Sequence, residues 1–162
     1  MIPVIDLFAG PGGLGEGFSS LRDCQGNPIF QTIMSVERDN QAHSTLLLRS
    51  YYRKIVKEDG TAPRAYISFL KHPTEENLQK LLNVDSRALE AARSEALCAE
   101  LKENDNSLVY LAEERLRVFD PKHSEPWVLI GGPPCQAYSL VGRSRRTNER
   151  DKLEKDEKQT LY

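Results

Sequence analysis

Hydrophobic and polar positions at the start of the chain follow two different periods. Pro3 to Ala9 is a short apolar run that ends at a cluster of glycines beginning with Gly10, which predicts a strand followed by a tight turn. Beyond the turn, Leu14, Phe18 and Leu21 recur at the spacing of one helical face. We therefore predict a helix that uses this face to cover a sheet.

The next segments repeat the order of strand and helix. Phe30 to Val36 follows a turn at Gly26 to Pro28 and is predicted to be a second strand, which ends at Glu37. Asp39 to Val56 has an apolar stripe at helical spacing and precedes the breaker Gly60. The order strand, helix, strand, helix is typical of a parallel sheet.

The middle of the chain leaves two alternatives for a third strand. Ala65 to Leu70 and Ser107 to Leu111 both have strand-like composition, and the pattern does not decide between them. Ser86 to Glu103, which includes Cys98, has apolar residues at helical spacing throughout and is predicted to be one helix. Pro126 to Ile130 is predicted to be a strand buried on both faces, because its apolar character is nearly continuous.

Composition narrows the classes of protein to be considered. The 162 residues suit one globular domain, and a net charge of −2 gives no overall attraction for nucleic acid. The three cysteines include no C-x-x-C pair, so neither a disulfide framework nor a zinc site is predicted, and a reducing compartment is the simplest interpretation. No apolar run is long enough to span a membrane, and Asp6 interrupts the apolar N-terminus, which does not resemble a signal peptide.

The glycine cluster carries the first chemical signal. Residues 10–15 (GPGGLG) match the pattern G-x-G-x-x-G after a predicted strand, where glycine lets a ligand approach the backbone and the following helix offers free amides. Glu37 closes the second strand, where an acid can accept hydrogen bonds from both hydroxyls of a ribose. A plain glycine-rich turn and a solvated acid are the alternatives. Together the two features indicate a cofactor that contains a nucleoside.

A second signal lies at the end of the predicted last strand. Cys135 follows Pro133 and Pro134 directly, so the backbone before the thiol is stiff, and open α/β sheets bind ligands at this end of their strands. Nearby positive charge favours a thiolate, and three arginines follow within about a dozen residues. A buried thiol acting as a small hydrophobe is the alternative. We predict a nucleophilic Cys135 and assign no such role to Cys24 or Cys98.

These residues together resemble a known family, the DNA (cytosine-5) methyltransferases. Residues 6–13 (DLFAGPGG) look like the family's first motif, Glu37 matches the acid of its second, and residues 134–139 (PCQAYS) look like its fourth. Methyltransferases that act on exocyclic amines carry Asp or Asn, two prolines and an aromatic where this chain has Gly132, Pro133, Pro134 and Cys135. A cysteine at that position suits covalent activation of a ring carbon.

The resemblance implies an α/β, Rossmann-like fold that uses S-adenosyl-L-methionine, with a mostly parallel sheet and helices on both faces. It implies cofactor contacts from Phe8 against the adenine, Glu37 on the ribose, and further residues of the first, second and fourth motifs: Ala9, Gly10, Pro11, Gly12, Gly13, Arg38 and Pro134. Cys135 would attack carbon 6 of a cytosine flipped out of double-stranded DNA. The resemblance implies DNA contacts from Gln136, Ser139, Arg143, Arg145 and Arg146, although a solvated charged segment is the alternative for the arginines.

The chain departs from the family at several points. Arg38 stands where the family often has an aromatic residue, and 98 positions separate Glu37 from Cys135, which implies a helical insertion at about residues 60–120. The family's third-motif acid, which reaches the adenine amine, has no clear place; Asp59 and Asp120 are candidates for it or surface acids. The later motifs and the target-recognition region do not appear. We therefore expect residues 1–162 to be the N-terminal part of a longer catalytic domain, with residues 139–162 as the catalytic loop and charged segment.

Three other functions remain open at this point. An RNA cytosine-5 methyltransferase shares the same motifs, a dinucleotide-binding oxidoreductase has the same glycine turn, and a non-enzymatic module binds the cofactor alone. The expected partners are double-stranded DNA and the missing C-terminal part of the same enzyme, with no membrane. The expected location is the cytoplasm or the nucleoid.

Overall fold

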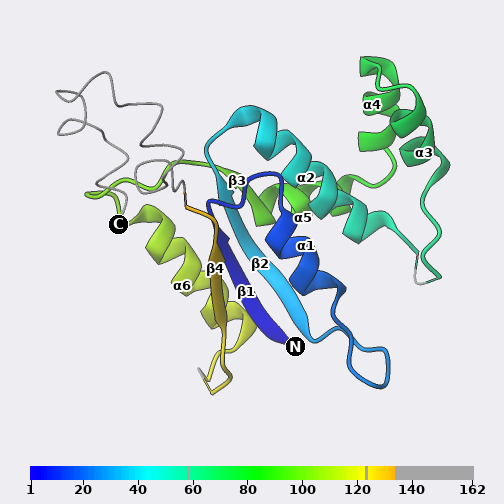
Figure 1. The fold of residues 1–162 in the computed structure, drawn as a ribbon. Helices are drawn as coiled ribbons and strands as arrows, with labels where there is room; N and C mark the ends of the chain where they lie inside the picture. Colours follow the sequence, from blue (N-terminus) through cyan, green and yellow to red (C-terminus); the bar gives the residue numbers. More distant parts are fainter. Residues whose placement is uncertain (58, 123, 134–162) are drawn as a thin grey trace, which may run out of the picture. The chain divides into compact units, whose positions relative to one another are not determined.

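Four parallel strands form the sheet of the compact unit Met1–Gly131 (Figure 1). The structure is a computed structural model that describes residues 1–57, 59–122 and 124–133. The strands are β1 (Ile2–Leu7), β2 (Phe30–Glu37), β3 (Ala96–Cys98) and β4 (Val128–Gly131), and their order across the sheet is β3-β2-β1-β4. β1 pairs with β2 on one side and with β4 on the other, so the ends of these strands lie along one edge.

In the described ranges, six helices connect the strands or pack against the sheet and one another. They are α1 (Gly13–Ser20), α2 (Asn40–Ile55), α3 (Arg64–Lys71), α4 (Glu75–Leu82), α5 (Ser86–Glu95) and α6 (Ser107–Phe119). Three helices begin at a side chain that accepts hydrogen bonds from first-turn amides: Asp39 for α2, Thr74 for α4 and Asp85 for α5. None of the helices in the described ranges is both long and apolar enough to cross a bilayer.

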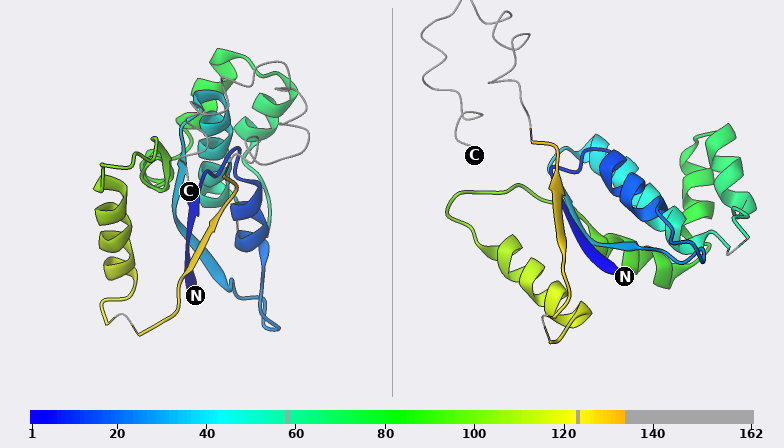
Figure 2. Two further views of the ribbon diagram at one scale, coloured as in Figure 1. Left: turned by 60° about the vertical axis from the view of Figure 1, so that its left-hand side comes forward. Right: turned by 60° about the horizontal axis from the view of Figure 1, so that its bottom comes forward.

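Helices lie on both faces of the sheet, as the two views in Figure 2 show. On one face, α6 packs over a cluster that contains Ile5, Met34 and Val36. On the other face, α1 and α2 lie over the sheet, and Leu46 of α2 packs against Ala9 and Ala96. The predicted α/β fold with a parallel sheet and helices on both faces is confirmed.

A second buried cluster holds α3, α4 and α5 to α2. It is centred on Tyr51, Leu81, Ala88 and Ala92, and Tyr66 of α3 packs against it. The Tyr51 hydroxyl donates to the Leu81 carbonyl at 3.1 Å. The segment between α2 and β3 is therefore a helical layer built on α2.

Three predictions about the middle of the chain are wrong. The third strand is β3, at neither of the two predicted places: residues 65–70 lie in α3 and residues 107–111 in α6. The helix predicted from Ser86 to Glu103 ends at Glu95, and Cys98 lies in β3. The spacing was misleading because Leu97 and Leu101 continue the helical period by chance while they pack against the sheet cluster under α6.

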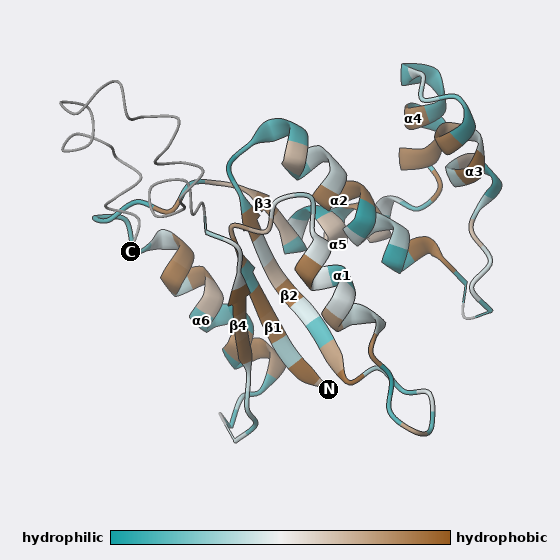
Figure 3. Cartoon of the chain, viewed as in Figure 1, coloured by the Kyte–Doolittle hydropathy of each residue, from teal (hydrophilic) through white to brown (hydrophobic). Residues whose placement is uncertain are grey.

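Two predictions of burial are also wrong. Of the predicted apolar face, Phe18 is partly buried and packs edge-on against Phe30, but Leu14 and the C-cap residue Leu21 are 50% and 48% exposed. The fully buried residue of α1 is Gly15. β4 was predicted to be buried on both faces, yet Leu129 is 56% exposed. Figure 3 shows β4 coloured as hydrophobic along its length, and its only strand partner among the described residues is β1.

Candidate functional site at the carboxyl edge of the sheet

The turn after β1 departs sharply from ordinary backbone geometry. Phe8, Gly10 and Gly12 have φ values of 55°, 56° and 89°, in the left-handed region that side chains disfavour. A Cβ at Gly12 would lie 2.9 Å from the Leu46 side chain. Glycine is therefore required at Gly12 by both backbone and packing, and the positive φ of Phe8 is strain of the kind found at binding sites.

The outer side of this turn faces open space. A Cβ at Gly10 or at Gly13 would have no other atom within 4 Å, so the two glycines leave a cradle that side chains would fill. The N-cap of α1 is Gly12, which offers no side-chain cap. Within the described ranges, the backbone amides of Gly13 and Leu14 have no hydrogen-bond acceptor. A polar ligand group can take these two amides.

Glu37 joins the end of β2 to the glycine turn. Its Oε2 accepts a hydrogen bond from the Gly10 amide at 2.8 Å, and its Oε1 accepts one from the Asp39 amide at 2.7 Å. The side chain is half-buried, so part of the carboxylate remains open to a ligand. The structure therefore brings together Glu37 and the turn, two features that the sequence places 27 positions apart.

The end of β3 adds residues that the sequence analysis missed. Cys98 pairs in register with Glu37, and Glu100 follows two residues later. Glu100 accepts a hydrogen bond and ion pair from the Arg38 guanidinium at 2.7 Å, and both side chains are exposed. No sequence signal pointed to Glu100, because the third strand was placed elsewhere.

The two acids considered for the third motif lie in other places. Asp59 is in the turn after α2, where it accepts a hydrogen bond from the Thr61 amide at 2.8 Å. Asp120 is the C-cap of α6 and accepts from the Lys122 amide at 3.1 Å. Neither follows a strand of the sheet, so neither lies where the third motif is expected.

Asp6 is a second residue whose importance the pattern did not show. Its side chain is fully buried in β1, beneath the first turn of α1, and neither carboxylate oxygen has a hydrogen-bond partner of ordinary geometry. Burial raises the pKa of this carboxyl to about 6, against the opposing effect of the Gly15 amide. The charge of Asp6 therefore changes at mildly acidic pH.

The end of β4 lies beside the start of the glycine turn. Gly131 pairs in register with Leu7, and a Cβ at Gly131 would lie 2.4 Å from the Leu7 carbonyl oxygen. Glycine is thus required for the two strands to approach. The predicted functional residues further along the chain lie outside the described residues: Pro134, Cys135, Gln136, Ser139, Arg143, Arg145 and Arg146.

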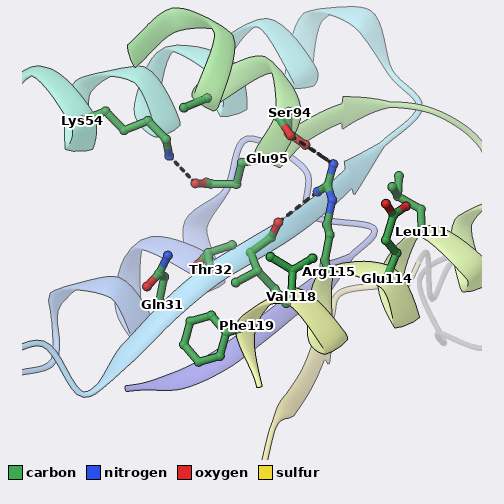
Figure 4. A pocket seen from close by; sticks show the side chains of 12 residues that line it. Gln31, Thr32, Lys54, Ser94, Glu95, Leu111, Glu114, Arg115, Val118 and Phe119 are labelled. Atoms are coloured by element: carbon green, nitrogen blue, oxygen red, sulfur yellow. Dashed lines mark hydrogen bonds and ion pairs between the residues drawn. The ribbon is translucent and has the colours of Figure 1, made fainter. Parts of the chain in front are cut away.

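A cavity of about 510 Å³ lies away from this edge, between β2, α5 and α6 (Figure 4). Several of its polar side chains already have protein partners. Arg115 donates to the Ile33 carbonyl at 2.9 Å and to the Ser94 carbonyl, and Glu95 pairs with Arg53 and Lys54. We interpret it as a packing cavity rather than a ligand site. In the part of the chain that the structure describes, no three acidic, histidine or cysteine side chains are grouped to hold a metal.

The fold and the edge define a class: an α/β protein with a Rossmann-like parallel sheet whose glycine turn and strand-end acid suit a nucleoside-containing ligand. Across 176 aligned positions, which include 98% of this chain, it is 30% identical to the Type II methyltransferase M.Bpa9945I of Bacillus paralicheniformis. The chain spans 36% of the length of that protein. No family model matches the chain, and no solved structure matches it.

Proposed function

We propose that this chain is part of a DNA cytosine-5 methyltransferase that acts as a modification enzyme and uses S-adenosyl-L-methionine. Its likeness to a Type II methyltransferase over nearly the whole chain supports methyl transfer, with DNA as the acceptor. The observation that carries the proposal is the hydrogen bond between the Gly10 amide and Glu37 at the carboxyl edge of the sheet. It joins the two features expected to hold the two ends of the cofactor.

The residues of the edge fit this cofactor. Glu37 has carboxylate oxygens to accept hydrogen bonds from ribose hydroxyls, and the free amides of Gly13 and Leu14 suit the methionine carboxylate. Phe8 stands at the strained end of β1, where the family places an aromatic ring against adenine. We assign the third-motif role, which is to accept a hydrogen bond from the adenine amine, to Glu100. This residue comes two positions after Cys98, the last residue of β3, which pairs in register with Glu37.

The transfer itself depends on residues that lie outside the described ranges. We propose that the Cys135 thiolate bonds to carbon 6 of a flipped-out cytosine, which makes carbon 5 nucleophilic. The cofactor supplies a methyl group on a positively charged sulfur. As carbon 5 takes the methyl group, the bond between that methyl group and the cofactor sulfur would break and release S-adenosylhomocysteine. A base would then take the proton from carbon 5, and the electron pair of that bond would expel the Cys135 thiolate from carbon 6. Gln136, Ser139, Arg143, Arg145 and Arg146 are proposed to contact DNA, with the arginines at phosphates.

Binding by the 162-residue chain tests the cofactor. Calorimetry should detect S-adenosylmethionine and S-adenosylhomocysteine but not NAD. Glu37→Ala should weaken binding of both by about 1 to 3 kcal/mol, because hydrogen bonds to a charged acceptor are lost. Glu76→Ala, which removes an exposed carboxylate on α4, is the control and should leave both affinities unchanged. Binding of NAD in preference to S-adenosylmethionine would refute the methyltransferase proposal.

The target and the nucleophile are tested in the chain extended to the full length of its own reading frame. Duplex DNA that contains 5-fluorocytosine should trap a covalent complex, because the fluorine on carbon 5 cannot leave as a proton does. Cys135→Ser should abolish the complex, whereas Cys24→Ser and Cys98→Ser should not. If the enzyme methylates an exocyclic amine of cytosine or adenine instead of carbon 5, the assignment as a methyltransferase stands and the cytosine-5 assignment is wrong.

A further inference from the structure

The buried carboxylate of Asp6 has no role in the proposed chemistry so far. It is fully buried, and neither of its oxygens has a hydrogen-bond partner of ordinary geometry, although buried carboxylates are normally paired. Its neighbour in register on β2 is Ser35, and the nearby Thr32 hydroxyl shares a hydrogen bond of 3.2 Å with Ser19. An unpaired buried acid is costly, so its presence needs a physical reason.

Asp6 lies directly behind the helix terminus that forms the ligand cradle. A Cβ at Gly15, in the first turn of α1, would lie 3.2 Å from Asp6 Oδ2, so the carboxylate packs against the helix backbone. The N-terminus of a helix carries partial positive charge and by itself attracts anions such as phosphate. A carboxylate behind that terminus offsets the positive charge.

The charged side chains on the elements around Asp6 do not neutralise it. On α1, Glu16 pairs with Arg53 of α2, and at the end of β2, Glu37 accepts from backbone amides. Lys54 of α2 pairs with Glu95. Two further ionisable side chains of α2 lie toward the sheet and the turn. His43 contacts the Ala96 carbonyl, and Arg49 lies beside the turn, where its Cδ would be 3.8 Å from a Cβ at Gly12. β4 carries no charged residue. None of these side chains is bonded to Asp6, so the field of the ionised Asp6 acts on the cradle together with the opposing field of Arg49.

We propose that Asp6 determines the charge of the ligand that the glycine turn accepts. Its buried carboxylate favours the positively charged sulfonium cofactor over the neutral thioether product and over dinucleotides, whose pyrophosphate is anionic. This inference rests on the proposed function, and it makes Asp6 a specificity-determining residue that acts through its field rather than by contact. The proposal also explains why Asp6 has no ion-pair partner. A positively charged partner would cancel the electrostatic field that the carboxylate exerts on the ligand.

A comparison of two ligands that differ by one charge tests the proposal. S-adenosylmethionine and S-adenosylhomocysteine share the same adenosine, amino and carboxyl groups and differ by one methyl group and the positive charge that it gives to sulfur. The methyl contribution is the same in wild type and variant, so a change in the ratio of the two dissociation constants reports the effect of the charge. At about pH 7.5 the wild-type chain should prefer S-adenosylmethionine, and Asp6→Asn should reduce this preference about fivefold, as expected for one charge roughly 10 Å away at an intermediate dielectric. Glu76→Gln makes the same change in net charge at an exposed position and should leave the ratio unchanged.

The pH dependence of the same ratio provides a readout that a structural role would not change. Because the pKa of Asp6 lies at about 6, the wild-type preference should fall between about pH 7.5 and pH 5 to the value of the Asn variant. The Asn variant should show no such fall. If that variant does not fold, the pH profile of the wild type alone tests the proposal. A wild-type ratio that is constant with pH, or equal ratios in wild type and Asp6→Asn, would overturn the role of Asp6 while the cofactor assignment stands. Binding of neither ligand by the wild type would overturn both proposals.

Discussion

At the scale of single residues, the most consequential side chain is one that destabilises the fold. Asp6 occupies a fully buried position in β1, beneath α1, where an apolar residue would stabilise the sheet. The Gly15 amide stabilises its ionised form only in part, and neither carboxylate oxygen has a hydrogen-bond partner of ordinary geometry. Residues that serve ligand binding often reduce stability in this way.

Asp6 should impose a specific pH dependence on stability. Since its pKa is raised to about 6 in the native state from an ordinary 3.8, the native state binds more protons than the unfolded state between these values. The free energy of unfolding should therefore fall as pH rises from about 4 to about 7, by at most about 3 kcal/mol from this group. Urea unfolding of wild type and Asp6→Asn across this range checks the prediction. The variant should lack this fall, and parallel profiles for the two proteins would contradict it.

The site residues divide clearly into those that sequence predicts and those it does not. The turn at Gly10 and Gly12 and the place of Glu37 at the end of β2 were predictable, because they depend on local backbone geometry and on where a strand ends. Glu100 and the burial of Asp6 were not. They depend on which distant strand comes to lie beside β2, and on a helix that approaches β1 closely through Gly15.

At the scale of elements, α1 illustrates how packing overrides periodicity. Its apolar residues Leu14 and Leu21 are about half exposed, while Gly15 makes the contact with the sheet. A glycine permits an approach that a leucine face prevents. Similarly, the apolar and aromatic residues of α3 suggested a strand, but Tyr66 and Phe69 instead pack on the cluster around Tyr51.

The two glycines of α1 should respond differently to substitution. Gly17 is exposed and a Cβ there meets no atom within 4 Å, so Gly17→Ala should raise the free energy of unfolding by about 0.5 to 1 kcal/mol through helix propensity. Gly15→Ala should give no such gain, because its Cβ would crowd Asp6 Oδ2 at 3.2 Å. Urea unfolding of both variants measures the difference. Equal stabilisation by Gly17→Ala and Gly15→Ala would show that α1 does not pack against Asp6 at Gly15 as described.

At the scale of the whole compact unit, the outermost strand β4 exposes apolar side chains. Trp127, just before β4, and Leu129, within it, are 49% and 56% exposed. Among the described residues, β4 pairs only with β1 and has no strand partner on its other side. Free edges that carry apolar side chains invite pairing with another chain.

The 162-residue chain should therefore self-associate through this edge. Leu129→Lys should reduce the association, because a charged residue blocks edge pairing. Leu70→Lys on α3 is a matched control, since Leu70 is also 56% exposed but lies on a helix. Sedimentation velocity at several concentrations measures the effect. A monomeric wild type at every concentration, or an equal effect of both substitutions, would contradict the prediction.

The helical layer of α3, α4 and α5 has a consequence for how this protein changes over evolutionary time. α3 and α4 pack around Tyr51 and Leu81, whereas the proposed ligand edge consists of strand ends and the turn at Gly10. A substitution in one of these regions therefore changes a different set of contacts from a substitution in the other. The α3–α4 segment can therefore lengthen, shorten or change its sequence without altering the contacts of the glycine turn, and we expect the two regions to diverge at different rates among relatives of this chain.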